Sequence, residues 1–203
     1  MITVKERPIL FSGPMVRAIL EGRKTQTRRV IKLPESRGEW EASTLGGPGV
    51  YYKDGTPCNS EDAIIWNTTT GKCMGSPYGM SGDRLWVRET FMRAVPDHIK
   101  IGKRIYVYKT DDDADRWSKY WKWSPSIHMP RIASRINLEI TNIRVERVQD
   151  ISRADCEAEG LKLLQGGVRS EFAVLWDSIN KARGYGWTKN PWVWVVEFKV
   201  IHG

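Results

Sequence analysis

The apolar alternation between residues 136 and 145 constrains the fold most, because its phase changes once. Apolar and polar residues alternate from Ile136 to Ile140, and the alternation resumes one position out of phase at Ile143. Successive side chains of a strand point to opposite faces, so a slip of one residue would turn the apolar set away from the core. We therefore predict a β-bulge or bend at Thr141–Asn142, a device that barrels use to close.

Strand-like segments outnumber helical ones in the rest of the chain. Strands are expected at 9–12, 25–31, 84–90, 105–108 and 192–200. Helices are expected from Pro14 to Gly22, from Ser152 to Gly160 and from Phe172 to Gly184, whereas 111–123 reads as a polar helix or a loop. No regular strand–helix–strand rhythm of a parallel sheet is present. These patterns predict an α+β fold, a small β-barrel with flanking helices, as a single domain over 1–203.

Glycine and proline recur between residues 33 and 80, at a density that differs from the rest of the chain. Connections of this length that lack regular structure are uncommon in compact domains and are usually functional or mobile. We interpret 33–80 as an insertion into the single domain, with a short hairpin near Ile64–Trp66.

The charge of the chain favours a polyanionic partner, although a merely soluble basic protein remains the alternative. The formal net charge is +8 at pH 7, and the cations cluster. Between Val16 and Lys32 they are Arg17, Arg23, Lys24, Arg28, Arg29 and Lys32, against Glu21 alone. No run of apolar residues is long enough to cross a membrane, and the first residues do not form a secretory signal. The expectation is a cytoplasmic protein.

The cysteines do not indicate a cofactor or metal site. The three of them, Cys58, Cys73 and Cys156, are too few and too irregularly spaced for a disulfide framework. Cys58 and Cys73 lack the paired Cys or His spacing of a zinc site. We predict reduced thiols, no metal and no cofactor.

The segment after the first helix contains several side chains with catalytic or binding potential within a few residues. A glycine that ends the helix, Gly22, is followed by Lys24, Thr27, Arg28 and Arg29. A lysine, an alcohol and paired guanidinium groups are suited to a pocket for an anionic or nucleoside-like ligand.

This arrangement, Gly22, Lys24, Thr27 and Arg29 after a helix, resembles the GxKxxTxR signature of ASCH domains. That family is a branch of the PUA-like barrel superfamily. The stretches 9–19, 82–90, 126–131 and 190–195 look like a bacterial and phage-associated subgroup of it. The resemblance covers the chain apart from the segment 33–80. It implies a PUA-like barrel with a cleft for RNA or a modified nucleoside.

With a threonine at position 27, this chain resembles the ASCH enzymes that remove the acyl group from N4-acetylcytidine. In those enzymes a lysine, a threonine and a distant glutamate act together, which by position implies Lys24, Thr27 and Glu89 here. Thr27 would be the nucleophile or would orient a water, and Lys24 would be its base if burial near Arg28 and Arg29 lowers its pKa. Glu89 would hold the lysine or shuttle its proton.

Each of these residues also has a structural interpretation. Thr27 is a common residue in strands, Lys24 can be a solvated turn residue, and Glu89 can pair with an arginine. On a regular strand, positions 24 and 27 face opposite ways, so catalysis requires Lys24 to precede the strand. By the same alternation, at most one of Arg28 and Arg29 is expected to line the pocket.

Other residues are candidates for binding the ligand. Ser12, Gly13 and Pro14 precede free helix N–H groups, which favour an anion, or they simply cap the helix. The remaining candidates are Trp86, Arg88, His128 and Arg131, with core packing as the alternative for the tryptophan and a structural hydrogen bond for the histidine. The aromatic and cationic run 117–123 suits a lid or a single-stranded nucleic acid.

Three functions remain open from the sequence. The first is hydrolysis of an N4-acylated cytosine in RNA or in a modified nucleoside. The second is a non-catalytic, regulatory module that binds RNA or DNA. The third is a ribonuclease, which is ranked last because neither a histidine pair nor a metal cluster is evident.

Overall fold

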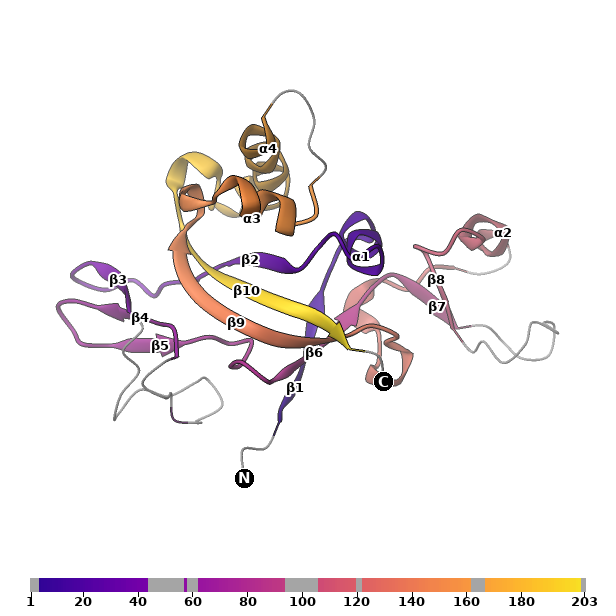
Figure 1. Cartoon of the computed structure of the whole chain (residues 1–203), viewed down its shortest axis with the longest axis horizontal. Coiled ribbons are helices and arrows are strands. Elements are labelled where there is room, and N and C mark those ends of the chain that lie inside the picture. Colours follow the sequence, from indigo (N-terminus) through magenta and orange to yellow (C-terminus); the bar gives the residue numbers. More distant parts are fainter. Residues whose placement is uncertain are drawn as a thin grey trace.

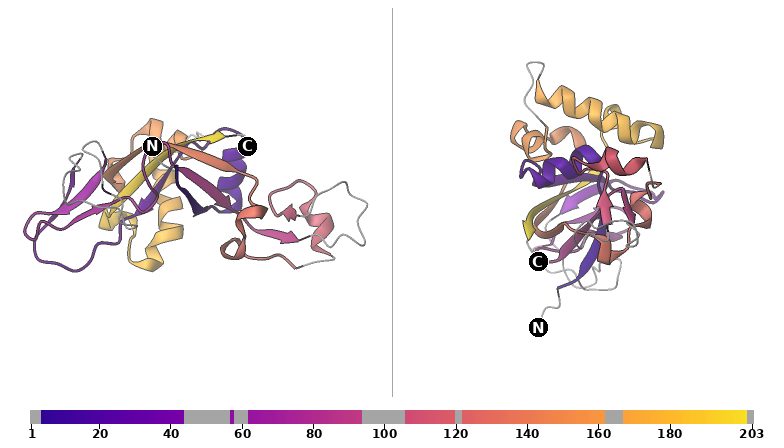
Figure 2. Two further views of the ribbon diagram at one scale, coloured as in Figure 1. Left: turned by 90° about the horizontal axis from the view of Figure 1, so that it is seen from below. Right: turned by 90° about the vertical axis from the view of Figure 1, so that its right-hand side faces the viewer.

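The computed structural model describes residues 4–43, 57, 62–93, 106–119, 122–161 and 167–201, and the side chain of Trp117 is not among the features described. Its mixed helix and strand content confirms the α+β prediction. The described strands form a five-stranded, a three-stranded and a two-stranded sheet (Figure 1). The five-stranded sheet lies in the middle, and the two small sheets lie at opposite ends of an elongated molecule (Figure 2).

The central sheet has the strand order β1-β6-β9-β10-β2. Its strands are β1 (Glu6–Leu10), β6 (Arg84–Arg88), β9 (Asn137–Arg147), β10 (Trp192–Ile201) and β2 (Gln26–Val30). β1 and β6 run parallel, and the other neighbours are antiparallel. The long strands β9 and β10 curve together through the centre (Figure 1).

The bulge predicted at Thr141–Asn142 is confirmed. Glu197 of β10 pairs with Asn142, but the next residue, Phe198, pairs with Ile140, so Thr141 is the extra residue. This one insertion keeps the apolar residues on both sides of it directed to the same core.

The central sheet is open, so the predicted barrel is not confirmed. β1 and β2 are its two edges, and no backbone ladder joins them among the described residues. The residues that lead into β2 pair elsewhere, since Thr25 N–H donates to the Ala158 carbonyl at 2.8 Å. A side chain spans the gap instead, because Arg29 Nη2 donates to the Leu10 carbonyl at 2.5 Å.

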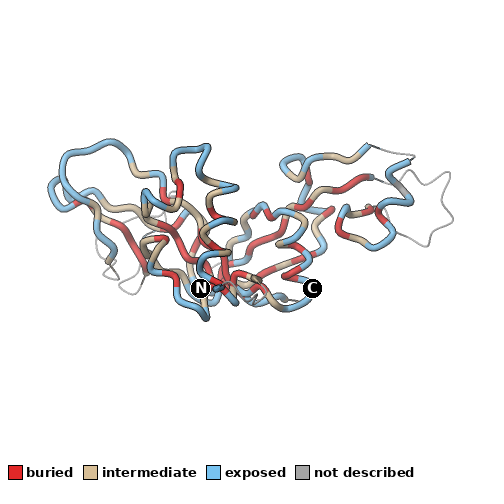
Figure 3. Tube along the Cα trace, turned by 90° about the horizontal axis from the view of Figure 1, so that it is seen from above, coloured by how far each residue is buried: buried red, intermediate tan, exposed pale blue. Residues whose placement is uncertain are grey.

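Two hydrophobic cores share strand β10. Trp194 and Val196 pack in the first core, with residues of β1, β6, β9 and α1. Val193 and Val195 point the other way, into a second core with α3 and α4. Full burial of each valine contributes roughly 1.5–3 kcal/mol, so β10 stabilises the fold from both faces. Buried residues accordingly follow the central strands (Figure 3).

Helix α1 (Gly13–Leu20) begins and ends where the sequence predicts. Pro14 occupies its first turn, where the missing N–H removes no helical bond. Gly22 adopts a left-handed φ of 71°, which a glycine takes without strain. The turn lets Lys24 N–H donate to the Ala18 carbonyl at 3.0 Å and so fixes the lysine at the end of the helix.

Helices α3 (Arg153–Ala158) and α4 (Val168–Asn180) lie on the same side of the central sheet (Figures 1 and 2). The predicted capping box is present, with Ser152 and Asp155 exchanging side-chain to backbone hydrogen bonds. After α4 a 3₁₀ turn, Lys181–Arg183, ends at the left-handed Gly184. No helix among the described residues combines the length and apolar character needed to cross a bilayer.

The segment 33–80 contains an antiparallel sheet of β3 (Trp40–Ser43), β4 (Ile64–Asn67) and β5 (Cys73–Gly75). The β4–β5 hairpin confirms the predicted one, and β3 was not foreseen. Residues 44–56 and 58–61, including Cys58, lie outside the described residues.

The other small sheet pairs β7 (Phe91–Arg93) with β8 (Tyr106–Tyr108), and α2 (Ala114–Ser118) follows it. The strand predicted over 84–90 ends at Arg88 as β6, and β7 begins just after the predicted segment. Of the aromatic run 117–123, the Trp117 side chain, Tyr120 and Trp121 lie outside the described features, so its role as a lid stays a prediction.

Candidate functional site

A cavity of about 470 Å³ lies between β2 and α4, a volume within the usual range of small-molecule sites. Its main lining residues are Phe11 and Ser12 after β1, Thr27, Arg28 and Arg29 of β2, Tyr78, Glu159 at the end of α3, and Phe172, Leu175, Trp176 and Ile179 of α4. One wall is therefore cationic and the other apolar and aromatic. Such a combination suits a ligand with a flat ring and an anionic or carbonyl group.

Lys24 lies directly behind this lining. It precedes β2, as catalysis was argued to require, and its side chain has no exposed surface. Its Nζ lies 5.8 Å from the centroid of the Phe11 ring. Burial lowers the pKa of Lys24 from its ordinary value, and the neighbouring Arg29 and Arg28 lower it further, while Glu159 opposes the shift. This direction meets the condition under which Lys24 could act as a base.

The carboxylate that meets Lys24 is Glu159. Lys24 Nζ donates to Glu159 Oε2 at 2.6 Å and to the Glu159 backbone carbonyl at 2.9 Å. The other carboxylate oxygen, Oε1, is buried without a hydrogen-bond partner among the described residues and lies 3.5 Å from Arg28 Nη1. A buried, unpartnered oxygen is unfavourable unless something else binds it, and Glu159 lines the cavity.

Gly160 holds the lysine and the glutamate together. Its φ of 89° is left-handed, and a Cβ at this position would lie 2.9 Å from Ala18 Cβ and 3.0 Å from Lys24 Cβ. The end of α3 can approach the turn after α1 this closely only with a glycine there.

Thr27 and Arg28 sit deep in the cavity wall, 3% and 5% exposed. Arg28 Nη2 contacts Glu146 Oε2 at 2.9 Å and Asp155 Oδ2 at 3.2 Å. Arg144 joins both of these carboxylates from the other side. Arg28 is thus fixed by a network of partly buried charges, and its Nη1 and Nε have no hydrogen bond within the described part of the chain.

Arg29 occupies the gap between the edge strands. It donates to the Leu10 carbonyl and stacks over the Phe11 ring at 5.0 Å. Its Nε is buried with no partner in the described ranges, so a donor is available at the cavity. Both Arg28 and Arg29 line the cavity, which corrects the expectation of at most one. β2 is an edge strand, so the cavity extends around its border to both faces.

Glu89 lies in a different environment from Lys24. Its carboxylate accepts hydrogen bonds from Thr110 Oγ1 at 2.6 Å and from Arg135 Nε at 2.9 Å and Nη2 at 3.1 Å. The side chain is only 2% exposed, and it is absent from the lining of the cavity. These contacts agree with the alternative to catalysis that was given for Glu89, a glutamate that pairs with an arginine. The partner of Lys24 is Glu159 and not the predicted Glu89.

The predicted binding residues separate into two groups. Ser12 lines the cavity, whereas Gly13 and Pro14 form the first turn of α1 without being part of that lining. Their role as anion ligands stays a prediction.

The second group gathers around Trp86. The guanidinium groups of Arg88 and Arg131 lie 4.7 and 5.9 Å from the Trp86 ring, and Arg131 pairs with Glu6 at 3.0 Å. His128 is exposed in the 3₁₀ turn Ser126–His128, whose first residue, Ser126, reaches the cavity. Ligand binding by these residues stays a prediction.

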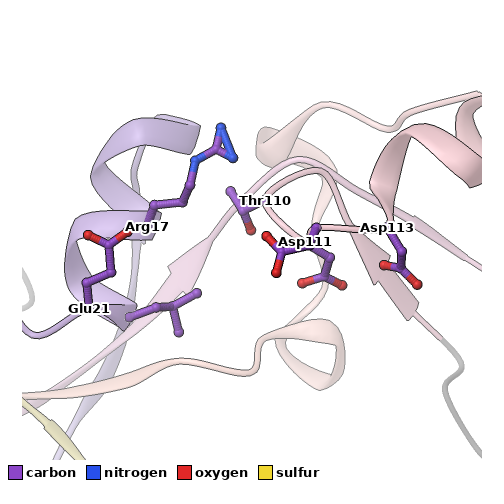
Figure 4. A pocket seen from close by; sticks show the side chains of 7 residues that line it. Arg17, Glu21, Thr110, Asp111 and Asp113 are labelled. Atoms are coloured by element: carbon purple, nitrogen blue, oxygen red, sulfur yellow. The ribbon is translucent and has the colours of Figure 1, made fainter.

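A shallower hollow of about 510 Å³ lies between α1 and the loop after β8 (Figure 4). Its lining includes Arg17 and Glu21 of the α1 region and the acidic residues Asp111 to Asp113. The excess of carboxylates makes it a poor site for a polyanion. Within the described ranges, no group of three or more histidine, cysteine or acidic residues is placed to hold a metal ion. Cys73 and Cys156 are free thiols.

Neither a protein-family model nor a curated protein sequence matches this chain. Among solved structures, it is similar to the crystal structure of protein EF3133 from Enterococcus faecalis V583, which carries the family description DUF984. The two share 8% identity, and the superposition covers 99% of this chain and 82% of that one with a TM-score of 0.44. A likeness this distant carries no argument, so the function rests on the residues themselves.

Sequence reasoning missed Glu159, Tyr78 and the α4 wall as parts of the site. Phe172 and Trp176 lie in the helix that the sequence predicts from Phe172 to Gly184, and both also pack in a core. The one available signal for Glu159 was its place just before Gly160, a glycine that ends a helix.

Proposed function

We propose that this chain is an ASCH-type hydrolase that removes the acyl group from an N4-acylated cytosine bound between β2 and α4. The family assignment rests on the resemblance of the Gly22–Arg29 segment. The single observation that carries the catalytic proposal is the buried Lys24–Glu159 pair, whose glutamate lines the same cationic-walled cavity as Thr27.

The hydrogen bonds of Lys24 suit a general base. A neutral lysine amine has two N–H groups, which match the two acceptors that Glu159 provides, Oε2 and the backbone carbonyl. The nitrogen lone pair then stays available for a proton. Burial favours this neutral form, and Glu159 takes the supporting role that the family resemblance implies for Glu89.

The reaction follows in two steps. Lys24 accepts the proton of the Thr27 hydroxyl as its oxygen bonds to the acyl carbon, and the C–N bond to cytosine breaks. The proton passes from Lys24 to the departing N4 amine. The same lysine then deprotonates a water, whose oxygen bonds to the acyl carbon as the ester bond to Thr27 breaks. The lysine returns this proton to the Thr27 oxygen, so the carboxylic acid leaves and both residues are restored.

Arg29 supplies charge stabilisation in this scheme. Its unpartnered Nε donates to the carbonyl oxygen, which becomes negative during both steps. Fixed donors of this kind contribute about 2.7–4 kcal/mol to transition-state stabilisation. Trp176 and Phe172 of α4 provide the apolar surface for the ring of the cytosine.

The test is chromatography of N4-acylated cytidines incubated with wild type and with Thr27→Val, which keeps the shape and removes the hydroxyl. Wild type is expected to release cytidine, and the variant to lose about 10²–10⁴-fold in rate. Circular dichroism checks that the variant is folded. If a folded Thr27→Val protein released cytidine at the wild-type rate, Thr27 would be excluded as the nucleophile.

Binding of RNA or DNA without catalysis is the second candidate, favoured by the net charge of +8. In that case wild type would bind single strands with an affinity that falls steeply with salt. It would leave every acylated cytidine unchanged.

A further inference from the structure

A second cavity, of about 510 Å³, continues from the first along the end of β2. Its lining comes from Val30, Ile31 and Lys32, from Cys73, Met74 and Gly75 of β5, and from Pro77, Tyr78 and Trp194. Val30, Lys32 and Tyr78 line both cavities. The two spaces therefore meet at one border, formed by an aliphatic, a cationic and an aromatic side chain.

The side chains at this border are suited to bind the sugar–phosphate link between two bases. Lys32 is exposed, and Arg29 lies near enough to Tyr78 to act on its phenol electrostatically. The second cavity itself is mostly apolar, with Met74 and Trp194 among its walls. Stacking of bases on aromatic surfaces beside a cationic track is the general pattern of single-strand binding.

The distance along β2 excludes the acyl group as the occupant of the second cavity. A strand rises about 3.3 Å per residue, so Ile31 lies about 13 Å along the chain from Thr27. A short acyl group that reacts at Thr27 does not span this length, whereas the next unit of a polymer does.

We propose that the second cavity receives the nucleotide adjacent to the acylated cytosine, so that the site acts on single-stranded nucleic acid in preference to a free nucleoside. This inference rests on the proposed function for the occupant of the first cavity. Strand β5 and Tyr78, both in the Gly/Pro-rich segment 33–80, line the added subsite.

Cys73 provides a reporter for this subsite. Its thiol is half-buried in the second cavity, whereas Cys156 is fully buried. N-ethylmaleimide modification of Cys73 is followed by peptide mass spectrometry, with cytidine, a six-nucleotide RNA or the matching DNA present. Each oligonucleotide carries one central cytidine and is held at saturation, as judged by fluorescence anisotropy. Either oligonucleotide is expected to slow modification at least about fivefold, and cytidine to leave it unchanged.

Lys32 tests the contact with phosphate. Lys32→Ala is expected to lower the slope of log affinity against log salt by about 1 for the oligonucleotide. The matched control is Lys72→Ala, an exposed lysine that is in the lining of neither cavity, and its slope should equal that of wild type.

The outcomes separate this inference from the proposed function. Oligonucleotides that fail to bind, or that bind without protecting Cys73, overturn the second subsite even if free N4-acetylcytidine is hydrolysed. Protection of Cys73 by an oligonucleotide, with no hydrolysis of any acylated cytidine, supports the subsite and overturns the hydrolase. If the salt slope of Lys32→Ala equals that of wild type, the proposed contact between Lys32 and phosphate is contradicted.

Discussion

At the scale of single residues, the site depends on which carboxylate meets Lys24. Sequence position pointed to Glu89, but Glu159 is the residue in contact, and Glu89 is held by Arg135 and Thr110. The sequence could predict Lys24 and Thr27 because both stand in one short motif. It could not predict Glu159, which lies far along the chain and reaches the lysine only through tertiary packing.

Glutamine substitutions distinguish the two carboxylates. Glu159→Gln is expected to lower kcat for N4-acetylcytidine by about 10²–10⁴-fold, because the amide cannot support the lysine as the carboxylate does. Glu89→Gln is expected to lower the free energy of unfolding by about 1–3 kcal/mol through its buried hydrogen bonds. Steady-state kinetics and denaturant titration measure both. Loss of kcat in a stable, folded Glu89→Gln protein, with Glu159→Gln active, would return the catalytic role to Glu89.

The lowered pKa of Lys24 gives the stability of the protein a defined pH dependence. In the unfolded chain the pKa returns to the ordinary 10.5. Between the lowered pKa and 10.5 the unfolded state binds more protons at this residue, so stability rises with pH through that window. Denaturant titration over this window should show wild type gaining stability relative to Lys24→Met, and a difference that is flat or falls would contradict the shift.

At the scale of elements, the site forms because β2 is an edge strand whose entrance is tied to α3. Local signals predicted α1, the turn at Gly22 and the capping box of α3, since each depends on residues close in sequence. The phase change in β9 predicted the bulge at Thr141. Barrel closure is not confirmed; it depends on contacts between distant edge strands, and the residue before β2 bonds instead to α3, from Thr25 N–H to the Ala158 carbonyl.

Gly160 tests the contact between these elements. Gly160→Ala places a methyl group against Ala18 and Lys24, so we expect a loss of about 1–3 kcal/mol from overpacking in addition to backbone strain, together with reduced turnover. The matched control is Gly82→Ala, which has nearly the same φ, 88° against 89°, and nothing within 4 Å. It should lose only the strain, about 1–2 kcal/mol, and keep its turnover. If Gly160→Ala and Gly82→Ala lost the same amounts of stability and turnover, the close packing of α3 against the turn after α1 would not be needed for the site.

At the scale of the whole molecule, the central sheet supplies the site and the segment 33–80 extends it. Composition predicted a basic protein for an anionic partner, but charge alone did not locate the cavity. Its two walls, β2 and α4, are far apart in sequence, and its border with the second cavity at Tyr78 belongs to a segment without a regular pattern. The side of the molecule that carries α2 has the acidic hollow instead (Figure 4), so the cationic surface for a ligand lies between β2 and α4.

The most direct measurement is the release of cytidine from N4-acetylcytidine by wild type and by Lys24→Met, side by side at equal concentrations of folded protein. The account predicts cytidine and acetate in equal amounts from wild type and at least about 10²-fold slower release from the variant. Intact substrate with wild type, or cytidine from Lys24→Met at the wild-type rate, would contradict it.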